Sequence, residues 1–216
     1  MTASPPWRHL GKPVPRVDAP EKAVGTLVYP SDSSQEGLLW VRVLRAGRPH
    51  TRILNIDTDA AKRIPGVTAV LTAKDVPGRN LCGAVVPDRP VLCEDIARYE
   101  GDAVALVAAE SREAAAIALD EIRVDYEDQP SLLSIEDALS PDAAPIHGDS
   151  NLFKEIHVGW GDVEAGFQEA DWVVEENFRT HSQTHIYLET EAAFSYFDEE
   201  GRLAVVATGQ FPQFDR

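Results

Sequence analysis

The sequence predicts an α+β fold in two parts, a first domain followed by the beginning of a second one. Three observations indicate this. Residues 103–126 carry the pattern of a strand, a helix and a strand in immediate succession. Short apolar strands precede that unit, and a β-hairpin pattern follows it at residues 187–208. Strands that mix irregularly with a few helices are typical of this fold class.

The first segments read as an arm, three strands and a short helix. Residues 1–20 are rich in proline, so we expect an extended arm. Residues 57–64 predict a short helix that Asp57 or Thr58 can cap and that Pro65-Gly66 ends. The expected strands are short and apolar, and they cover residues 38–44, 53–56 and 67–71.

The central unit has the clearest pattern. Residues 103–109 are an unbroken apolar run, as in a buried strand. Ser111 is a suitable N-cap for an alanine-rich helix over residues 112–120. Apolar and charged side chains then alternate from Ile122 to Tyr126, as in a half-buried strand. The unit is either a crossover between parallel strands or a helix packed on one face of a mixed sheet.

A linker rich in proline and aspartate follows at residues 128–150. A short helix at 134–139, which Ser134 caps, interrupts it. A second capped helix is expected at residues 161–170. Gly159, Gly161 and Gly166 have the wrong spacing for a dinucleotide-binding fingerprint, so we interpret them as turn glycines before and within this segment.

The last third of the sequence has the pattern of strands and one tight turn. Apolar side chains alternate over residues 172–179, and a long strand is expected at 187–196. Gly201 supplies the positive φ of the turn into a return strand at 203–207. The apolar faces and open edge of this hairpin predict association with a partner chain or with a second copy.

Most of the net charge of −16 lies in the last third of the chain. Residues 1–60 carry a net charge of +2, residues 61–135 carry −5 and residues 136–216 carry −13. This acidity disfavours nucleic acid and anionic membranes as partners, because both would repel it. A solvated surface is the preferred explanation of the acidity, and a basic partner chain is the alternative.

The two cysteines and the start of the chain indicate the expected metal sites and the expected cellular compartment. Cys82 and Cys93 have no CxxC spacing, so we expect no zinc or iron–sulfur site in this chain, and Cys82 reads as a small buried side chain. No charged segment followed by an apolar core begins the sequence, and no apolar run reaches membrane-spanning length. We therefore expect a cytoplasmic protein.

Two pairs of polar residues near the hairpin are candidates for chemistry. His181 and His185 are spaced like zinc ligands on a helix, but on a strand they would lie about 13 Å apart, too far to share a metal. No metal-ligating residue is therefore expected. Glu189 and Glu191 would share a strand face and could do acid–base work, although one solvated charge is the commoner case.

Gln210 follows the return strand. Its amide carries two donors and one acceptor without charge. It can therefore steady an oxo or sulfido ligand of a metal without competing as a metal ligand. The residue type alone, however, does not indicate any function for a single glutamine after a strand.

Three stretches of the chain, taken in order, resemble the large subunit of the molybdenum hydroxylases, the xanthine dehydrogenase and aldehyde oxidase family. Residues 10–25 are similar to the leading arm of bacterial members. Residues 43–127, with Ile64-Pro-Gly-Val-Thr-Ala-Val-Leu-Thr-Ala-Lys-Asp-Val-Pro-Gly and Ile122-Arg-Val-Asp-Tyr-Glu, resemble the family's α/β hammerhead domain. Residues 185–210, from His185-Ile-Tyr-Leu-Glu-Thr onward, are similar to the opening of its first cofactor-binding domain.

The resemblance implies three segments. They are an extended arm at residues 1–20, an α/β hammerhead domain at 21–135, and the start of a first molybdopterin-binding α/β domain, left incomplete, at 145–216. The implied cofactor is molybdenum on a pterin, often in the cytosine dinucleotide form in bacteria. Gln210 would then lie beside the molybdenum, with Glu189 and His185 further out as supporting residues.

The resemblance also implies an oxidoreductase. Family members hydroxylate a carbon next to nitrogen or oxygen in heterocycles and aldehydes, and a few act on carbon monoxide or aryl-thioesters. The oxygen comes from water, and two electrons leave through iron–sulfur clusters and FAD on other subunits or domains.

The family's remaining cofactor loops, substrate-orienting residues and catalytic glutamate have no counterpart here, so no catalytic residue is expected in this chain. We expect the N-terminal portion of a molybdopterin-binding subunit that is inactive alone. Its partners would be the remaining molybdopterin-binding chain, iron–sulfur and flavin subunits, and a small-molecule substrate. Two alternatives stay open, a non-catalytic hammerhead module for interaction or assembly and a gene remnant without function.

Overall fold

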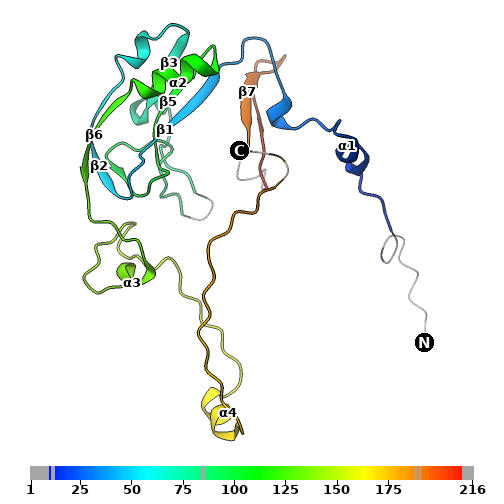
Figure 1. Ribbon diagram of the computed structural model, residues 1–216, viewed down its shortest axis with the longest axis vertical. Helices are drawn as coiled ribbons and strands as arrows, with labels where there is room; N and C mark the ends of the chain where they lie inside the picture. The colour runs from blue at the N-terminus through cyan, green and yellow to red at the C-terminus, as the bar shows by residue number, and fades with distance from the viewer. Residues whose placement is uncertain (1–9, 11–12, 84–85, 188, 190, 211–216) are drawn as a thin grey trace. The chain divides into compact units, whose positions relative to one another are not determined.

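The computed structural model describes residues 10, 13–83, 86–187, 189 and 191–210 (Figure 1). Residues 1–9 and 11–12 of the predicted arm, and residues 188 and 190 of the predicted long strand, lie outside these. The chain divides into two compact units. One is Glu36–Arg179, and the other combines Met1–Gln35 with Thr180–Arg216.

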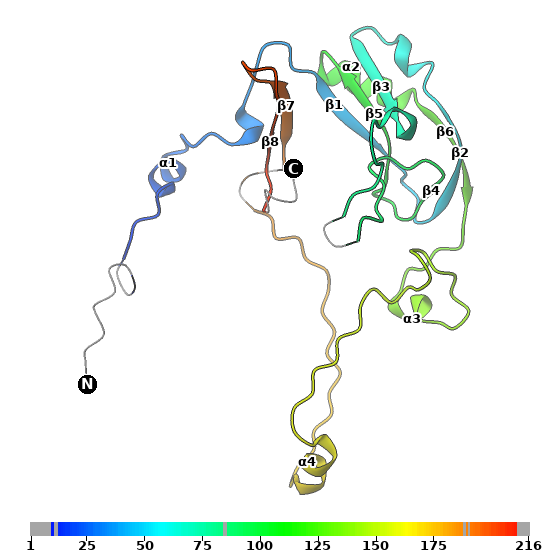
Figure 2. The same ribbon diagram turned by 180° about the vertical axis from the view of Figure 1, so that it is seen from behind.

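Two three-stranded antiparallel sheets build the larger unit (Figure 2). The first sheet has the order β1-β5-β3, with β1 at Trp40–Arg45, β3 at Val67–Thr72 and β5 at Ala103–Ala109. The second has the order β4-β2-β6, with β2 at Thr51–Asp57, β4 at Ile96–Ala97 and β6 at Arg123–Asp128.

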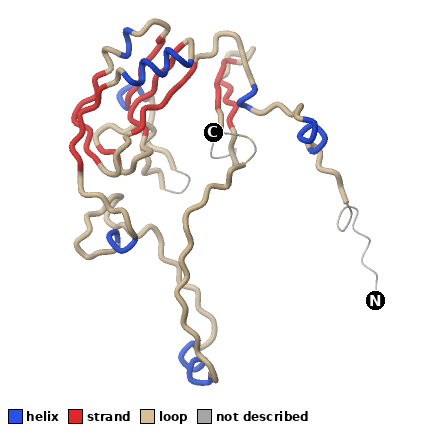
Figure 3. The backbone as a smooth tube through the Cα atoms, viewed as in Figure 1, coloured by secondary structure: helices blue, strands red, loops and turns tan. Residues whose placement is uncertain are grey.

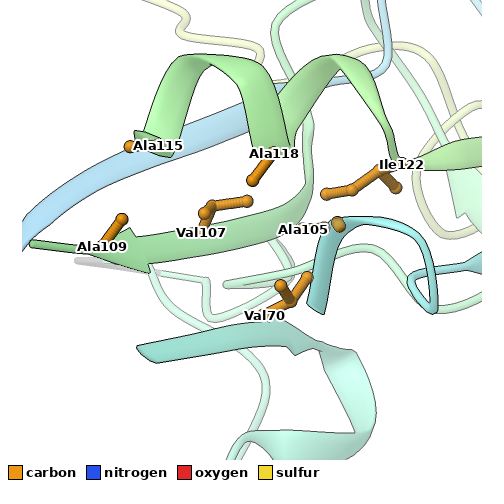
Figure 4. Packing of buried hydrophobic residues seen from close by; sticks show 8 residues of the cluster. Val70, Ala105, Val107, Ala109, Ala115, Ala118 and Ile122 are labelled. Carbon is orange, nitrogen blue, oxygen red and sulfur yellow. The ribbon is translucent and has the colours of Figure 1, made fainter. Parts of the chain in front are cut away.

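Helix α2, Arg112–Asp120, packs on β1 and β5. Small side chains let it approach closely, because alanines of the helix meet alanines and a valine of the strand (Figure 4). The fully buried members of this contact are Ala105, Val107, Ala109, Ala115 and Ala118. The Arg112 guanidinium also lies 4.1 Å from the ring centroid of Trp40 on β1, a cation–π contact that fixes the start of the helix.

Strand β5 is buried on both of its faces. Ala105 and Val107 belong to the core under α2, whereas Val104 belongs to a second core with Cys93 and Ala97. This explains why the sequence of β5 is continuously apolar and does not alternate. Burial raises the pKa of the Cys93 thiol to about 12, so this cysteine stays protonated.

Two predictions for this unit were wrong. Strands β5 and β6 lie in different sheets, so α2 is neither a parallel crossover nor a helix on a mixed sheet. The helix expected at residues 57–64 is only the 3-10 turn η2, Ala61–Arg63. Asp57 accepts a hydrogen bond from the amide of Asp59 at 3.0 Å, and this local turn replaces the first turn of a helix.

Cys82 was predicted to be buried, but it is exposed, and both cysteines are free. It lies opposite Arg89 in an isolated antiparallel bridge. At this bridge the Cys82 side chain points into solvent. The prediction considered only that cysteine is usually buried, and that preference does not reveal a position on a surface loop.

Beyond β6 the larger unit has little regular structure, as Figure 3 shows. Helices α3, Ile135–Ala138, and α4, Val163–Glu169, are capped by Ser134 and Asp162, whose side chains accept hydrogen bonds from the backbone amides of Asp137 and Ala165. The strand predicted at residues 172–179 does not form. Among the described residues no strand lies beside this backbone, and a strand without a partner is not stable in water.

The smaller unit holds the hairpin of β7, Ala193–Phe197, and β8, Leu203–Ala207, together with α1, Ala19–Val24, and the 3-10 turn η1, Pro30–Asp32. In the larger unit a further turn, η3, spans Ala73–Asp75. Helix α1 lies at the end of the segment predicted to be an extended arm. Pro20 in its first turn and Gly25, with φ of 73° at its C-cap, explain its bounds.

No helix in the described part of the chain has both the length and the apolarity that a membrane crossing needs.

The cap of α2 generates a stability prediction. The Ser111 hydroxyl accepts a hydrogen bond from the amide of Ala114 at 3.1 Å. Ser111→Ala should lower the free energy of unfolding by about 1 kcal/mol, measured by urea titration of the chain. Ser134→Ala removes the same kind of cap from α3, which has no buried residue, and should leave that transition unchanged. Equal losses in both variants would contradict the role of α2 in the core.

Candidate functional site

The hairpin of β7 and β8 is held firmly at its turn. Asp198 accepts hydrogen bonds from the amides of Glu200 at 3.0 Å and Arg202 at 2.8 Å, and the Arg202 side chain reaches its second oxygen at 2.8 Å. These bonds lower the pKa of the Asp198 carboxyl, the backbone amide of Arg202 most strongly. Gly201 has a φ of 75°, as the sequence predicted for this turn.

The other end of the hairpin is closed by Thr208. Its amide donates to the carbonyl of Ala192 at 3.1 Å, and its hydroxyl accepts from the amide of Ala192 at 3.1 Å. Gly209 and Gln210 follow directly, and the Gln210 side chain is exposed. The hairpin therefore presents the glutamine amide to solvent from a fixed backbone position.

The two faces of the hairpin differ. Phe194 and Tyr196 lie half-buried on one face, with ring centroids 6.0 Å apart, and η1 contacts β7. The hydroxyl of Tyr29, next to η1, is buried without a hydrogen-bond partner among the described residues. The opposite face is exposed and apolar, with Phe197, Leu203 and Val205. This face is free to pack against further polypeptide.

The two carboxylates before β7 have different neighbours. The strand begins at Ala193, so the predicted shared strand face of Glu189 and Glu191 does not exist. Glu191 accepts a hydrogen bond from the Tyr187 hydroxyl, which raises the pKa of Tyr187. Glu189 is half-buried and close enough to Arg16 to contribute to its raised pKa, after the larger effect of Asp18. The arm residue Arg16 therefore lies near Glu189.

The backbone just before this segment has an unusual conformation at one residue. Ile186 has a φ of 47°, the only non-glycine residue with positive φ in the described part of the chain. A β-branched residue adopts this conformation rarely, and it costs on the order of 1–3 kcal/mol. Neither the positive φ of Ile186 nor the closeness of Arg16 to Glu189 was predicted, because both depend on contacts that residue type and spacing do not encode.

His181 and His185 are both exposed in a segment without regular structure. Within the described residues there is no group of three or more His, Cys, Asp or Glu that could hold a metal ion. Of the predicted site residues, Gln210 is exposed at the hairpin end, Glu189 is half-buried and His185 is exposed next to Ile186.

Comparison with known families places both parts of the chain. Residues 24–130 match the family described as "Aldehyde oxidase and xanthine dehydrogenase, a/b hammerhead domain". Residues 146–216 match the family described as "Molybdopterin cofactor-binding domain". The chain belongs to the xanthine dehydrogenase and aldehyde oxidase family, and it corresponds to the N-terminal part of the molybdopterin-binding subunits. The predicted fold class is confirmed.

Individual relatives agree with this assignment. The chain is 41% identical to the nicotinate dehydrogenase large molybdopterin subunit of Eubacterium barkeri, over 97% of the chain and 49% of the relative. It is 43% identical to a probable xanthine dehydrogenase subunit of Bacillus subtilis (strain 168), over 93% of the chain and 27% of the relative. The chain thus spans about half of one relative and about a quarter of the other.

Solved structures share the fold. The aldehyde oxidoreductase of Desulfovibrio gigas matches with a TM-score of 0.81 and 34% identity, over 89% of this chain and 23% of that chain. Quinoline 2-oxidoreductase of Pseudomonas putida 86 matches with a TM-score of 0.75 and 26% identity, over 93% of this chain and 27% of that chain.

The residues at the hairpin end fit a molybdenum–pterin group in their chemistry. A metal carried by a pterin does not require a cluster of protein ligands, and the described residues offer none. Gln210 supplies an uncharged amide that donates and accepts hydrogen bonds, from a backbone that Thr208 fixes. The matched cofactor-binding region includes both residues.

The Thr208 closure generates a prediction about local order. Thr208→Val keeps the shape of the side chain and removes the acceptor for the amide of Ala192. Hydrogen exchange of the Ala192 amide should accelerate by about fivefold to tenfold, since one hydrogen bond contributes about 1 kcal/mol. Ser195→Ala, in an exposed position of β7, should leave that amide unchanged. Unaltered exchange in Thr208→Val would show that this contact does not hold the hairpin end.

Proposed function

We propose that the chain is the N-terminal portion of the molybdopterin-binding subunit of a molybdenum hydroxylase of the xanthine dehydrogenase and aldehyde oxidase type. The whole enzyme would oxidise a heterocycle or an aldehyde with oxygen derived from water. It would need another chain for the rest of the active site, and this portion would be inactive alone. The supporting observation is the exposed Gln210 at a fixed hairpin end, inside the region that matches the cofactor-binding family.

When bound, the molybdenum–pterin group supplies the two-electron oxidation chemistry. The role of this chain would be to orient the molybdenum–pterin group. The Gln210 amide can donate a hydrogen bond to an oxygen or sulfur atom on the metal, and as a neutral side chain it does not compete with those atoms for the metal. Burial of the site on assembly would strengthen such a bond, because water no longer competes for the donor.

Glu189 would have a supporting role. Its negative charge acts on Arg16 of the N-terminal arm, which brings an acidic side chain of this segment close to the arm. His185, exposed next to the positive-φ residue Ile186, would complete this supporting set.

The proposed partners follow from the same assignment. Iron–sulfur clusters and FAD on partner chains would carry the electrons away, and the cofactor would be the cytosine dinucleotide form. The Eubacterium barkeri and Bacillus subtilis relatives are both named as subunits, which is consistent with assembly from several chains. We place this complex in the cytoplasm.

A non-catalytic hammerhead module is the second candidate. The observation that favours it is the larger unit, which has two buried cores of its own. Such a module would bind an assembly partner without any cofactor in the complex. A purified complex that contains stoichiometric molybdenum would exclude this role.

Gln210 can be tested in the assembled complex. Gln210→Ala should lower turnover of an aldehyde or purine by about tenfold or more, while the molybdenum content measured by mass spectrometry is retained, because the lost hydrogen bond orients the cofactor and does not ligate the metal. Gln129→Ala is the matched control, because among the described residues that side-chain amide bonds only to Glu127 and Asp128 at the end of β6. Full activity of Gln210→Ala in a molybdenum-loaded complex would refute the assignment.

A further inference from the structure

Residues 152–178 expose large apolar side chains to an unusual degree. Phe153 and Trp160 are each 96% exposed, Phe178 is 92% exposed and Trp172 is 90% exposed. Single exposed apolar residues are ordinary on a protein surface, but several large ones on one short segment mark a contact surface. The only helix of this segment, α4, has seven residues and no buried residue. So short a helix is marginal in water without packing.

Helix α4 and the backbone after it form an apolar groove of about 420 Å³. The helix contributes Val163, Gly166 and Phe167, at the spacing i, i+3 and i+4 that places residues on one face of a helix. Trp172 and the two valines that follow form the other wall. Ala170, the C-cap residue in extended conformation, lines the groove where the helix ends.

Gly166 leaves the floor of the groove open. A Cβ atom at this position would meet no atom within 4 Å. The floor therefore has room for an inserted side chain, and Phe167 and Trp172 beside it offer aromatic surface for packing.

The residues that flank the groove lining in the sequence are strongly acidic, and we call them its acidic rim. Residues 162–176 contain six carboxylates and no lysine or arginine. The carboxylates are Asp162, Glu164, Glu169, Asp171, Glu175 and Glu176. Such a rim attracts a positively charged segment and repels an acidic one. A second copy of this chain would bring the same carboxylates to a symmetric contact and would be repelled.

We propose that this groove receives an apolar side chain from a basic segment of the polypeptide that completes the molybdopterin-binding domain. This inference rests on the proposed function. Two observations support that occupant over another. The groove lies within the residues that match the cofactor-binding family. The same fold occurs in the Desulfovibrio gigas chain. The match with the present protein spans only 23% of that chain, so the fold is accompanied there by much more polypeptide.

A photo-crosslinking experiment in the assembled complex tests the occupant. The photoreactive residue p-benzoylphenylalanine is placed at position 167, in the groove, and in a second variant at position 172 on its rim. After irradiation, peptide mass spectrometry should identify a cross-linked peptide that carries lysine or arginine and belongs to the molybdopterin-binding polypeptide outside residues 1–216. The same residue at position 133, an exposed leucine in the linker, should not reach that peptide.

Charge reversal tests the acidic rim. Glu164→Lys together with Glu169→Lys should lower the cross-link yield by about threefold or more, because the rim then repels a basic segment. Glu136→Lys, in an exposed position of α3, should leave the yield unchanged. An unchanged yield in the groove variant would overturn the electrostatic part of the inference.

Molybdenum content measured on the same preparations separates this inference from the proposed function. Cross-links to a second copy of this chain or to an iron–sulfur or flavin subunit, or no cross-link at all, in a molybdenum-loaded complex would overturn the groove assignment and leave the function intact. The expected cross-link in a complex without molybdenum would overturn the function and leave the docking surface intact.

Discussion

The close contact between α2 and β5 is the constraint on which the larger unit depends. Alanine and valine side chains on both elements let the helix lie directly on the strand, and five of them are fully buried. Because β5 also contributes Val104 to a second core, one strand joins the two sheets of the unit. A larger side chain at any of these alanines would separate the helix from the strand, and overpacking of this kind typically costs about 1–3 kcal/mol.

The region after β6 has no equivalent contact. Helices α3 and α4 have no buried residue, and Trp172 and Phe178 are almost fully exposed. The hairpin is regular at both ends, yet the face with Phe197, Leu203 and Val205 is uncovered. In a folded protein such apolar surface is covered by further polypeptide. The contrast between the two regions is consistent with a scaffold that has its own cores and a cofactor-binding region that depends on additional chain.

The sequence predicted the elements well where the local pattern and the tertiary contacts agree. Strand β5 and helix α2 have the predicted bounds, and Ser111 caps the helix, because capping and apolar spacing act locally. The sequence did not show that β5 and β6 pair in different sheets, since strand pairing depends on residues far apart in the chain. The strand expected at 172–179 failed for the same reason, because its pattern is correct and its partner strand is not among the described residues.

The candidate site was predictable only through the family resemblance. Gln210 has no neighbour in the sequence that indicates cofactor binding, and the proximity of Arg16 to Glu189 joins segments that lie far apart in the chain. The positive φ of Ile186 could not be predicted from residue type either, because isoleucine disfavours positive φ.

The most direct test of the central claim is the molybdenum content of the purified chain, measured alone and in complex with the remaining molybdopterin-binding polypeptide. If these residues form one side of a shared cofactor site, the chain alone should contain no stoichiometric molybdenum and the complex should contain it. Stoichiometric molybdenum in the chain alone, or a stable complex of both polypeptides that never holds the metal, would contradict a shared site.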